Sequence, residues 1–376
     1  MGKKNIVFRL YGNKNWIGGV YYKKNILYSA IQSEKLLAKY NIVICTTKYN
    51  EHLFDDIKDQ VTVKILPENK YLYEGLMLLR MLNPKNKFIY SVNSAIYDKF
   101  FWGSAISWIP DFQYKYYPKY FRDNEIDSRN KNYRKIADRK GKLVFSSNTC
   151  KEDFEKFFPN ATVDTYVVPF VSYIETEVRG IDASFEREVL AKFKLDNCRY
   201  VYIPNQFWQH KNHRVVFEAI EEVAKRYPEV NLKFVFTGEP NDFRSPEYNE
   251  QLKDYMNRPE VKERIINLGF VPRKDQLVVM KNARFLIQPS LFEGWGTVLE
   301  DAKVLDKSLL LSDIPVHREQ KNEKCTLFDP NNPADLADKI YAMKDFDEES
   351  DIETGLKRMQ ESAKKYSAEL ERLFDC

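Results

Sequence analysis

Strand-like and helix-like segments alternate along nearly the whole of this 376-residue chain. Short apolar runs rich in β-branched residues, such as residues 5–10 and 41–47, are typical of buried strands, and residues 19–40 between them follow a helical pattern. Alternation of this kind predicts parallel sheets that are covered by helices on both faces. Ligands in such an architecture bind beyond the carboxyl ends of the strands.

The alternation falls into two series. The first has further strand-like runs at residues 87–92, 105–110 and 142–147 and closes near residue 170. Residues 171–182 contain few apolar runs, so we interpret them as the connection between two domains. The strand-like runs of the second series are residues 199–205, 232–238, 264–270, 284–290 and 308–313. Its clearest helix is residues 213–227, which carries on one face Val216, Ile220, Val223 and Tyr227.

Two such series predict an α/β protein with two Rossmann-like domains, each built on a doubly wound parallel sheet, that face a cleft. We place the N-terminal domain at residues 1–177 and the C-terminal domain at residues 178–350. Residues 351–376 follow the acidic stretch DFDEESD and form an amphipathic C-terminal helix that is able to pack back on the N-terminal domain.

Composition excludes several classes of protein. Charged residues make up 30% of the chain and hydrophobic residues 43%, which is typical of a folded globular protein. The net charge of +4, from 59 basic and 55 acidic residues, does not support a nucleic-acid partner. No apolar run approaches the roughly 18 residues that a membrane span needs, and no secretory signal is visible.

The cysteines indicate a reduced protein in the cytoplasm, because they are odd in number and scattered, without a C-x-x-C pair. They are Cys45, Cys150, Cys198, Cys325 and Cys376.

The stretch PSLFEGWGTVLED (289–301) forms the turn between a predicted strand and a predicted helix. Gly294 and Gly296 on either side of Trp295 let a ligand approach the backbone, and a helix N-terminus attracts anions such as phosphate. Glu293 stands before the turn, where a carboxylate suits sugar hydroxyl groups better than phosphate. Glu300 and Asp301, about one turn into the helix, are candidates to hold a ribose diol.

Phosphate, sugar and ribose together indicate a nucleotide sugar. The alternative, on spacing alone, is an ordinary strand–helix turn with acidic residues in the first turn of its helix.

Residues 289–320, PSLFEGWGTVLEDAKVLDKSLLLSDIPVHREQ, resemble the donor-binding segment of the family 4 retaining glycosyltransferases of GT-B fold, the bacterial surface-polysaccharide type also described as glycosyl transferases group 1. That family carries an E-x(7)-E motif, and Glu293 fits its first glutamate. Asp301 stands eight positions later, where the second glutamate is expected, with Glu300 just before it. The resemblance leaves open which of these two carboxylates contacts ribose.

Two further segments of the second half agree with the resemblance. In YIPNQFWQHKNH (202–213), Lys211 fits the lysine of a basic pair that grips the donor diphosphate. The arginine of that pair is missing, and Asn205 or Gln206 stands near its place. NLGFVP (267–272) matches the strand whose following loop holds the base, through the backbone of Phe270 and Val271.

In the first half, Gly18 and Gly19 match glycines that approach the diphosphate from the N-terminal domain; a plain helix-capping turn is the alternative. The segment WIPDFQYKYYPKYF (108–121) resembles the acceptor-side segment. We assign Asp111 an acceptor-side role, with loop capping as the alternative. Tyr114 stands where a histidine is common in this branch, which argues against an imidazole base there.

The resemblance implies a metal-independent hexosyltransferase without a cofactor, in which the C-terminal domain binds the donor and the N-terminal domain binds the acceptor. The donor is a nucleotide diphosphate sugar, and the acceptor is a hydroxyl of a glycan or lipid-linked glycan in lipopolysaccharide or capsule synthesis. Lys211 and the backbone amides of Thr297 and Val298 stabilise the leaving diphosphate, and Glu293 orients the sugar.

Two other functions remain open. One is a nucleotide-sugar 2-epimerase of the same fold, which transforms the donor without an acceptor. The other is a non-catalytic nucleotide-sugar-binding subunit, suggested by the missing arginine and by Asp301.

The remaining polar features carry weaker signals. His210 and His213 have no third ligand nearby and do not predict a metal site, and His317 is expected to hydrogen-bond within its domain. The basic run at residues 129–142 is interpreted as a solvated helix face, with a peripheral contact to the inner face of the membrane as the alternative.

Overall fold

The structure, a computed structural model, describes residues 2–12, 17–91, 103–239, 242, 245–347 and 349–375. Three features discussed above lie wholly or partly outside these residues: residue 92 of the strand-like run at 87–92, residue 348 of the acidic stretch DFDEESD, and Cys376. The chain divides into two compact units. The first contains residues 1–118, 122–173 and 360–376, and the second contains residues 119–121 and 174–359.

The first unit is built on a parallel sheet of seven strands in the order β3-β2-β1-β4-β5-β6-β7. The strands are β1 (Lys4–Leu10), β2 (Tyr40–Thr47), β3 (Thr62–Leu66), β4 (Asn86–Tyr90), β5 (Ala105–Trp108), β6 (Lys142–Phe145) and β7 (Asp164–Val167). The helices of this unit are α1 (Ile17–Ile31), α2 (Glu34–Lys39), α3 (Lys70–Met81), α5 (Gln113–Tyr116), α6 (Asp123–Ala137) and α7 (Asn148–Phe157), with the 3₁₀ turns η2 (Lys48–Phe54) and η3 (Pro118–Tyr120).

The second unit is built on a parallel sheet of six strands in the order β10-β9-β8-β11-β12-β13. The strands are β8 (Tyr200–Ile203), β9 (Lys233–Phe236), β10 (Ile265–Asn267), β11 (Leu286–Gln288), β12 (Leu309–Ser312) and β13 (Cys325–Phe328). Its helices are α8 (Glu175–Arg179), α9 (Ala183–Lys192), α10 (His213–Arg226), α11 (Pro246–Asn257), α12 (Pro259–Lys262), α13 (Arg273–Asn282), α14 (Thr297–Val304), α15 (Pro315–Gln320) and α16 (Pro333–Ala342), with the 3₁₀ turn η4 (Gln209–Lys211).

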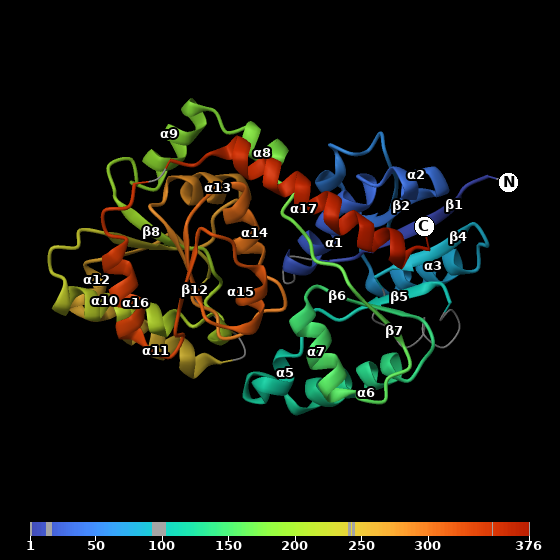
Figure 1. Ribbon diagram of the computed structural model, residues 1–376, viewed down its shortest axis with the longest axis horizontal. Coiled ribbons are helices and arrows are strands. Elements are labelled where there is room, and N and C mark those ends of the chain that lie inside the picture. The colour runs from blue at the N-terminus through green and yellow to red at the C-terminus, as the bar shows by residue number, and fades with distance from the viewer. Residues whose placement is uncertain are drawn as a thin grey trace. The chain divides into compact units, whose positions relative to one another are not determined.

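Helices cover both faces of the second sheet, with α10 and α16 on one face and α13 and α14 on the other (Figure 1). The predicted apolar face of α10 is confirmed, because Val216, Ile220 and Val223 are fully buried and Tyr227 packs at the edge of the same core. The predicted fold class is likewise confirmed: both units are doubly wound α/β structures with parallel sheets.

The helix expected at residues 19–40 is two helices. The chain leaves α1 after Ile31, and Ser33 caps α2 by accepting the backbone N–H of Leu36 at 3.1 Å. A serine side chain at this position competes for backbone hydrogen bonds and favours a helix start over a helix interior. β2 then begins at Tyr40.

The final helix, α17 (Ile352–Leu373), contributes its first residues to the second unit and its last residues to the first. At its C-terminal end, Glu371 accepts hydrogen bonds from Ser33 and Lys35, and the Phe374 ring packs 5.5 Å from that of Phe88. At its N-terminal end, Gly355 lies directly against the backbone carbonyl of Val304 at the end of α14. No helix of the described residues has the length and hydropathy needed to cross a membrane.

We predict that Gly355→Ala destabilises the protein, because an added Cβ overlaps the Val304 carbonyl group, which is backbone and cannot swing away. Overpacking of this kind costs about 1–3 kcal/mol. Urea denaturation followed by fluorescence measures the change. Gly75→Ala is the matched control: Gly75 lies within α3 with nothing within 4 Å of an added Cβ, so this change should leave stability equal or raise it. Equal midpoints for Gly355→Ala and wild type would contradict the prediction.

Candidate functional site

The strand order of the second sheet determines where a ligand can bind. The winding starts at β8 and proceeds outward through β9 and β10 on one side and through β11, β12 and β13 on the other, so it reverses between β8 and β11. Beyond the carboxyl ends of these two strands, the amide of Asn205 donates to Gln288 Oε1 at 2.9 Å. The loops that follow β8 and β11 therefore meet at the switch point, where doubly wound sheets bind their ligands.

Lys211 and Glu293, the two residues expected to hold phosphate and sugar, lie side by side at this point. Lys211 ends the 3₁₀ turn after β8, and its Nζ is 2.5 Å from Glu293 Oε1. Ser290 and Gln288 donate to the same oxygen at 2.6 and 3.0 Å. Both charged side chains are largely buried, at 16% and 11% exposure. The structure thus brings a cation and a carboxylate together in a hydrogen-bonded network.

Glu293 is held as a carboxylate. Burial alone raises the pKa of this group, but the Lys211 ammonium, nearby His210 and the hydrogen bonds from Lys211 and Ser290 outweigh it and lower the pKa to about 2. A permanently ionised carboxylate accepts hydrogen bonds and donates none. Glu293 is accordingly suited to accept the hydrogen of a hydroxyl group rather than to act as a general acid.

The turn between β11 and α14 is the segment expected to bind an anion. Gly296 precedes α14, and its N–H donates to Gln320 Oε1 at 2.9 Å. Because Gln320 uses this amide, Gly296 itself is not a phosphate donor. The N–H groups of Thr297 and Val298 lie in the first turn of α14, where a helix has no internal acceptor for them. Gly294 and Trp295 are half-buried in the same turn.

The two carboxylates at the start of α14 have different partners. Arg273, at the start of α13, donates to both oxygens of Asp301 at 2.7 and 2.6 Å, and the Asp301 side chain is only 2% exposed. Glu300 Oε1 accepts from Lys303 at 2.9 Å and from Gln320 at 2.8 Å. Since Arg273 occupies both oxygens of Asp301, the geometry favours Glu300 as the ribose contact; that role stays a prediction.

Asn205 and Gln206, near the place of the missing arginine, are already engaged. Asn205 is buried against Gln288, and Gln206 Oε1 accepts the backbone N–H of Glu239 at 3.0 Å. Gly238, after β9, has φ of +115°, and a Cβ there would overlap the Asn205 carbonyl. These residues fix the shape of the loop, and only the Gln206 side chain, which is half-buried, faces partly toward solvent.

The loop expected to hold the base follows β10. Its first turn needs Gly269, whose φ is +62° and whose carbonyl accepts the N–H of Gly238 at 2.8 Å. Phe270 is 62% exposed beside it, whereas Val271 is buried. This loop lies at the same edge of the sheet as Lys211 and Glu293, because the strands are parallel.

The sequence-predicted residues of the first unit are placed as follows. Gly18 and Gly19 lie in the first turn of α1 rather than in a turn before it. Asp111 Oδ1 accepts the N–H of Gln113 at 2.9 Å, which is the capping contact considered as its alternative role. Tyr114 is buried, and its hydroxyl donates to Asn130 Oδ1 at 3.1 Å. The acceptor-side role of Asp111 stays a prediction.

The histidines of the second unit are buried. His317 Nδ1 lies 2.9 Å from the Ser312 carbonyl, which confirms the expected hydrogen bond within the domain. His213 stacks on Phe207 with ring centroids 4.1 Å apart, and burial, assisted by Lys211, lowers its pKa to about 3. Within the described ranges, no three His, Cys, Asp or Glu side chains gather in the way that a metal ion requires.

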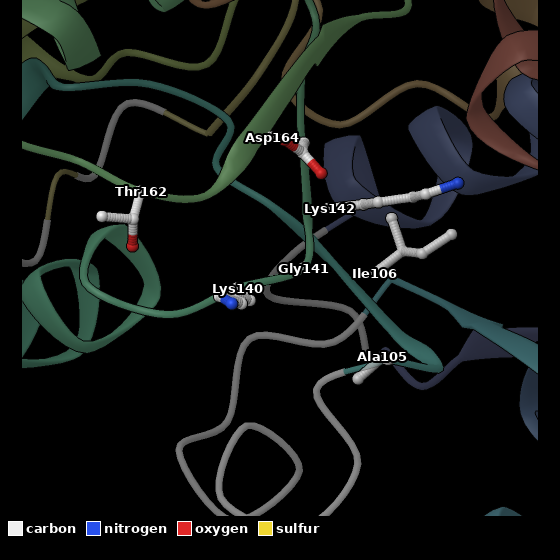
Figure 2. Close-up of a pocket in the computed structure, with 8 residues that line it drawn as sticks. Ala105, Ile106, Lys140, Gly141, Lys142, Thr162 and Asp164 are labelled. Atoms are coloured by element: carbon white, nitrogen blue, oxygen red, sulfur yellow. The ribbon is translucent and has the colours of Figure 1, made fainter.

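A hollow of about 440 Å³ in the first unit lies at the amino ends of its strands, opposite to the edge formed by their carboxyl ends (Figure 2). Three of the residues that line it are the first residues of β5, β6 and β7: Ala105, Lys142 and Asp164. Lys142 points away from Lys140 and donates to the Leu373 carbonyl at 2.6 Å. Doubly wound sheets bind ligands at the carboxyl ends of strands, so we do not assign a function to this hollow.

Sequence reasoning missed three groups that shape the site: Gln288 and Ser290, which hold Glu293, and Arg273, which holds Asp301. Gln288 and Ser290 lie within the predicted strand at residues 284–290, but no motif spacing marked their polar side chains as part of a site. It also missed Lys23 in α1, a buried lysine whose pKa burial lowers to about 7, with Arg9 acting in the same direction and Glu74 opposing.

Residues 186–365, in the second half of the chain, match the family described as Glycosyl transferases group 1. No curated protein matches the chain. Among solved structures, sucrose-phosphate synthase from Thermosynechococcus elongatus has a TM-score of 0.70 at 12% identity, covering 99% of this chain and 98% of that chain.

A glycosyltransferase from Rickettsia africae has a TM-score of 0.64 at 16% identity, covering 98% of this chain and 94% of the other. The Anabaena protein HepE, solved in complex with UDP and glucose, also has a TM-score of 0.64, at 14% identity, with 99% and 95% covered. At these identities the likeness shows the fold alone, and that fold is GT-B.

We predict a pH-dependent difference in stability between wild type and Glu293→Gln. A carboxyl group whose pKa is lowered by folding stabilises the protein above its ordinary pKa, and this contribution disappears as pH falls from about 4.5 to about 2. Replacement also leaves the buried Lys211 charge unpaired, so the variant should lose on the order of 3 kcal/mol at pH 7. Urea denaturation at several pH values, followed by the intrinsic tryptophan fluorescence of the chain, measures the difference. A difference that stays constant from pH 7 down to pH 3 would refute the assignment.

Proposed function

We propose that this protein is a retaining hexosyltransferase that uses a nucleotide diphosphate sugar as donor and a hydroxyl of a glycan or lipid-linked glycan as acceptor. The observation that carries the proposal is the contact between Lys211 and Glu293 at the switch point of the second sheet. In such a donor the diphosphate is attached directly to the sugar, so a phosphate-binding cation and a hydroxyl-binding carboxylate must be neighbours. Here they are 2.5 Å apart.

The group 1 family match supports transfer of a glycosyl group as the reaction. The GT-B neighbours support a nucleotide-sugar donor, because one of them was solved with UDP-glucose and another with a fluorinated UDP-glucose. The base and the sugar of the donor are left to the experiment. We also propose a cytoplasmic protein that acts in bacterial lipopolysaccharide or capsule synthesis.

In the proposed reaction, the acceptor oxygen attacks the anomeric carbon from the face that the diphosphate leaves. The bond between this carbon and the phosphate oxygen breaks, its electron pair stays on the diphosphate, and a phosphate oxygen takes the acceptor's proton. No separate base is needed. Lys211 and the N–H groups of Thr297 and Val298 stabilise the charge that develops on the leaving group.

Orientation of the sugar is the role of Glu293. Three donors hold its Oε1 in place, which fixes the carboxylate, and its second oxygen is the one that would accept a sugar hydroxyl hydrogen. Glu300 binds the ribose, and the backbone of Phe270 and Val271 holds the base. The roles of Asp111, Gly18 and Gly19 in the first unit stay predictions. We propose metal independence because Lys211 and the α14 amides supply the positive potential that a metal would otherwise provide.

We expect Lys211→Ala to weaken binding of a nucleoside diphosphate by ten- to a hundredfold, because a charge-assisted contact contributes roughly 1.5–3 kcal/mol. Calorimetric titration of the full chain with UDP, GDP and ADP measures the effect. Lys211→Ala alone leaves the Glu293 carboxylate unpaired. The double variant Lys211→Ala with Glu293→Gln also removes this charge, and it should show the same loss of affinity. Lys253→Ala, an exposed lysine of α11, is the matched control and should bind as wild type does. Equal affinity of wild type and both Lys211 variants for the nucleoside diphosphates would show that the diphosphate does not bind at Lys211.

The function is tested by incubation of the protein with radiolabelled nucleotide sugars, with and without a panel of glycan acceptors. We expect label to move to an acceptor, to retain its anomeric configuration, and to do so with chelator present. Glu293→Gln should reduce the rate by two orders of magnitude or more, because it weakens acceptance of the sugar hydroxyl. Conversion of the donor sugar without any acceptor would show a 2-epimerase instead. Tight donor binding with no turnover across the panel would show a binding subunit.

A further inference from the structure

Helix α3 of the first unit turns an apolar face to the outside. Its inner side packs on the sheet through Tyr73, Met77 and Met81, which are buried. On the opposite side, Leu72, Leu76 and Leu79 are 61%, 38% and 62% exposed. A surface helix normally places polar residues there. We call the outer side, with Tyr71 and Leu82 at its ends, the α3 face.

The α3 face is open and continuous. Gly75 lies among its leucines, and nothing lies within 4 Å of a Cβ added at this residue. Tyr71 and Leu82 are 86% and 66% exposed, so the apolar surface extends over the full length of the helix. A contiguous exposed apolar surface of this kind marks an interaction site.

Basic residues flank the α3 face at both ends. Residues 64–87 contain five basic and two acidic residues. Lys64 precedes α3 and Lys70 is its first residue, Lys85 and Lys87 follow the helix, and all four are exposed. Both acids have partners within the unit: Glu74 pairs with Arg9, and Glu68 accepts the N–H of Tyr49 at 2.9 Å. The surface therefore combines an apolar stripe with positive ends.

We propose that the α3 face docks on a membrane surface that carries anionic lipids. Leucines and a tyrosine enter the boundary between headgroups and acyl chains, and the flanking lysines meet lipid phosphates. A second copy of the chain fits less well. Because both ends of α3 are basic, parallel and antiparallel packing of two α3 faces would each bring like charges together.

The basic run at residues 129–142 is a weaker candidate for this contact. Arg129 donates to Glu125 at 2.8 Å, Arg139 donates to Ser107 at 2.8 Å, and Lys142 pairs with Asp375 at 2.5 Å. Three of the seven cations in this run are therefore neutralised or hydrogen-bonded within the first unit. The α3 face differs because its lysines stand close in the chain to exposed apolar side chains, and a membrane surface favours this combination.

The test is co-sedimentation of the full chain with vesicles of phosphatidylcholine alone or mixed with phosphatidylglycerol, without donor, so that it does not depend on the proposed function. We expect wild type to bind the mixed vesicles and to bind less as salt rises. Leu72→Gln with Leu79→Gln should weaken binding by about a hundredfold or more, since two apolar side chains no longer enter the lipid boundary. Lys70→Glu with Lys85→Glu should weaken binding to the mixed vesicles by about a hundredfold or more, because two cations are lost and two like charges now face the lipid phosphates.

Phe346→Gln is the matched control, because Phe346 is an exposed aromatic of the second unit and should not affect vesicle binding. All variants replace exposed side chains, and circular dichroism verifies that they fold. Absence of wild-type binding to mixed vesicles would overturn the proposal, and so would wild-type-like binding of the leucine variant. A dimer in solution that the leucine variant converts to monomer would assign the α3 face to self-association instead.

Discussion

Burial of the Glu293 carboxylate is the constraint on which the second unit's candidate site depends. A charge removed from water must be neutralised and hydrogen-bonded, or the unit loses several kcal/mol. Its partners come from the loop after β8 and from the end of β11. Ser290 in turn accepts a hydrogen bond from Ser312 at the end of β12 through its carbonyl. The solvation of one carboxylate thus ties together the ends of three neighbouring strands and fixes the loops that surround them.

The alternation of strands and helices was predictable because it is a local pattern. The face of α10 could be read from Val216, Ile220 and Val223, since the helical period repeats over four turns. Helix α3 and the strand before it were not predicted. Apolar side chains lie on both the inner and the outer side of α3, so its short apolar run does not read as a surface helix with one polar face. The break between α1 and α2 was missed because one capping serine decides it.

The loops of the candidate site were predictable from motif spacing, but the pairings within them were not. The spacing of eight residues from Glu293 places Asp301 in the second turn of α14. It does not predict which residue the Asp301 side chain contacts. Arg273, its partner, lies 28 residues earlier, on α13. Only the fold brings the two together: Arg273 at the start of α13 holds Asp301 of α14, whereas the adjacent Glu300 is bonded to Lys303 and Gln320.

If the site binds a nucleotide diphosphate sugar as we propose, its charge balance bears on the missing arginine. Lys211 Nζ lies 2.5 Å from Glu293 Oε1, so an entering diphosphate would meet an ion pair with no net charge. The phosphate would share the Lys211 ammonium with the carboxylate, and the N–H groups at the start of α14 would supply further stabilisation. Competition for the lysine weakens ground-state binding. When the bond to the sugar breaks, charge grows on the leaving phosphate, and its attraction to Lys211 rises relative to that of Glu293. An interaction that strengthens in this way along the reaction lowers the barrier more than it tightens binding of the donor, which is the condition for catalysis.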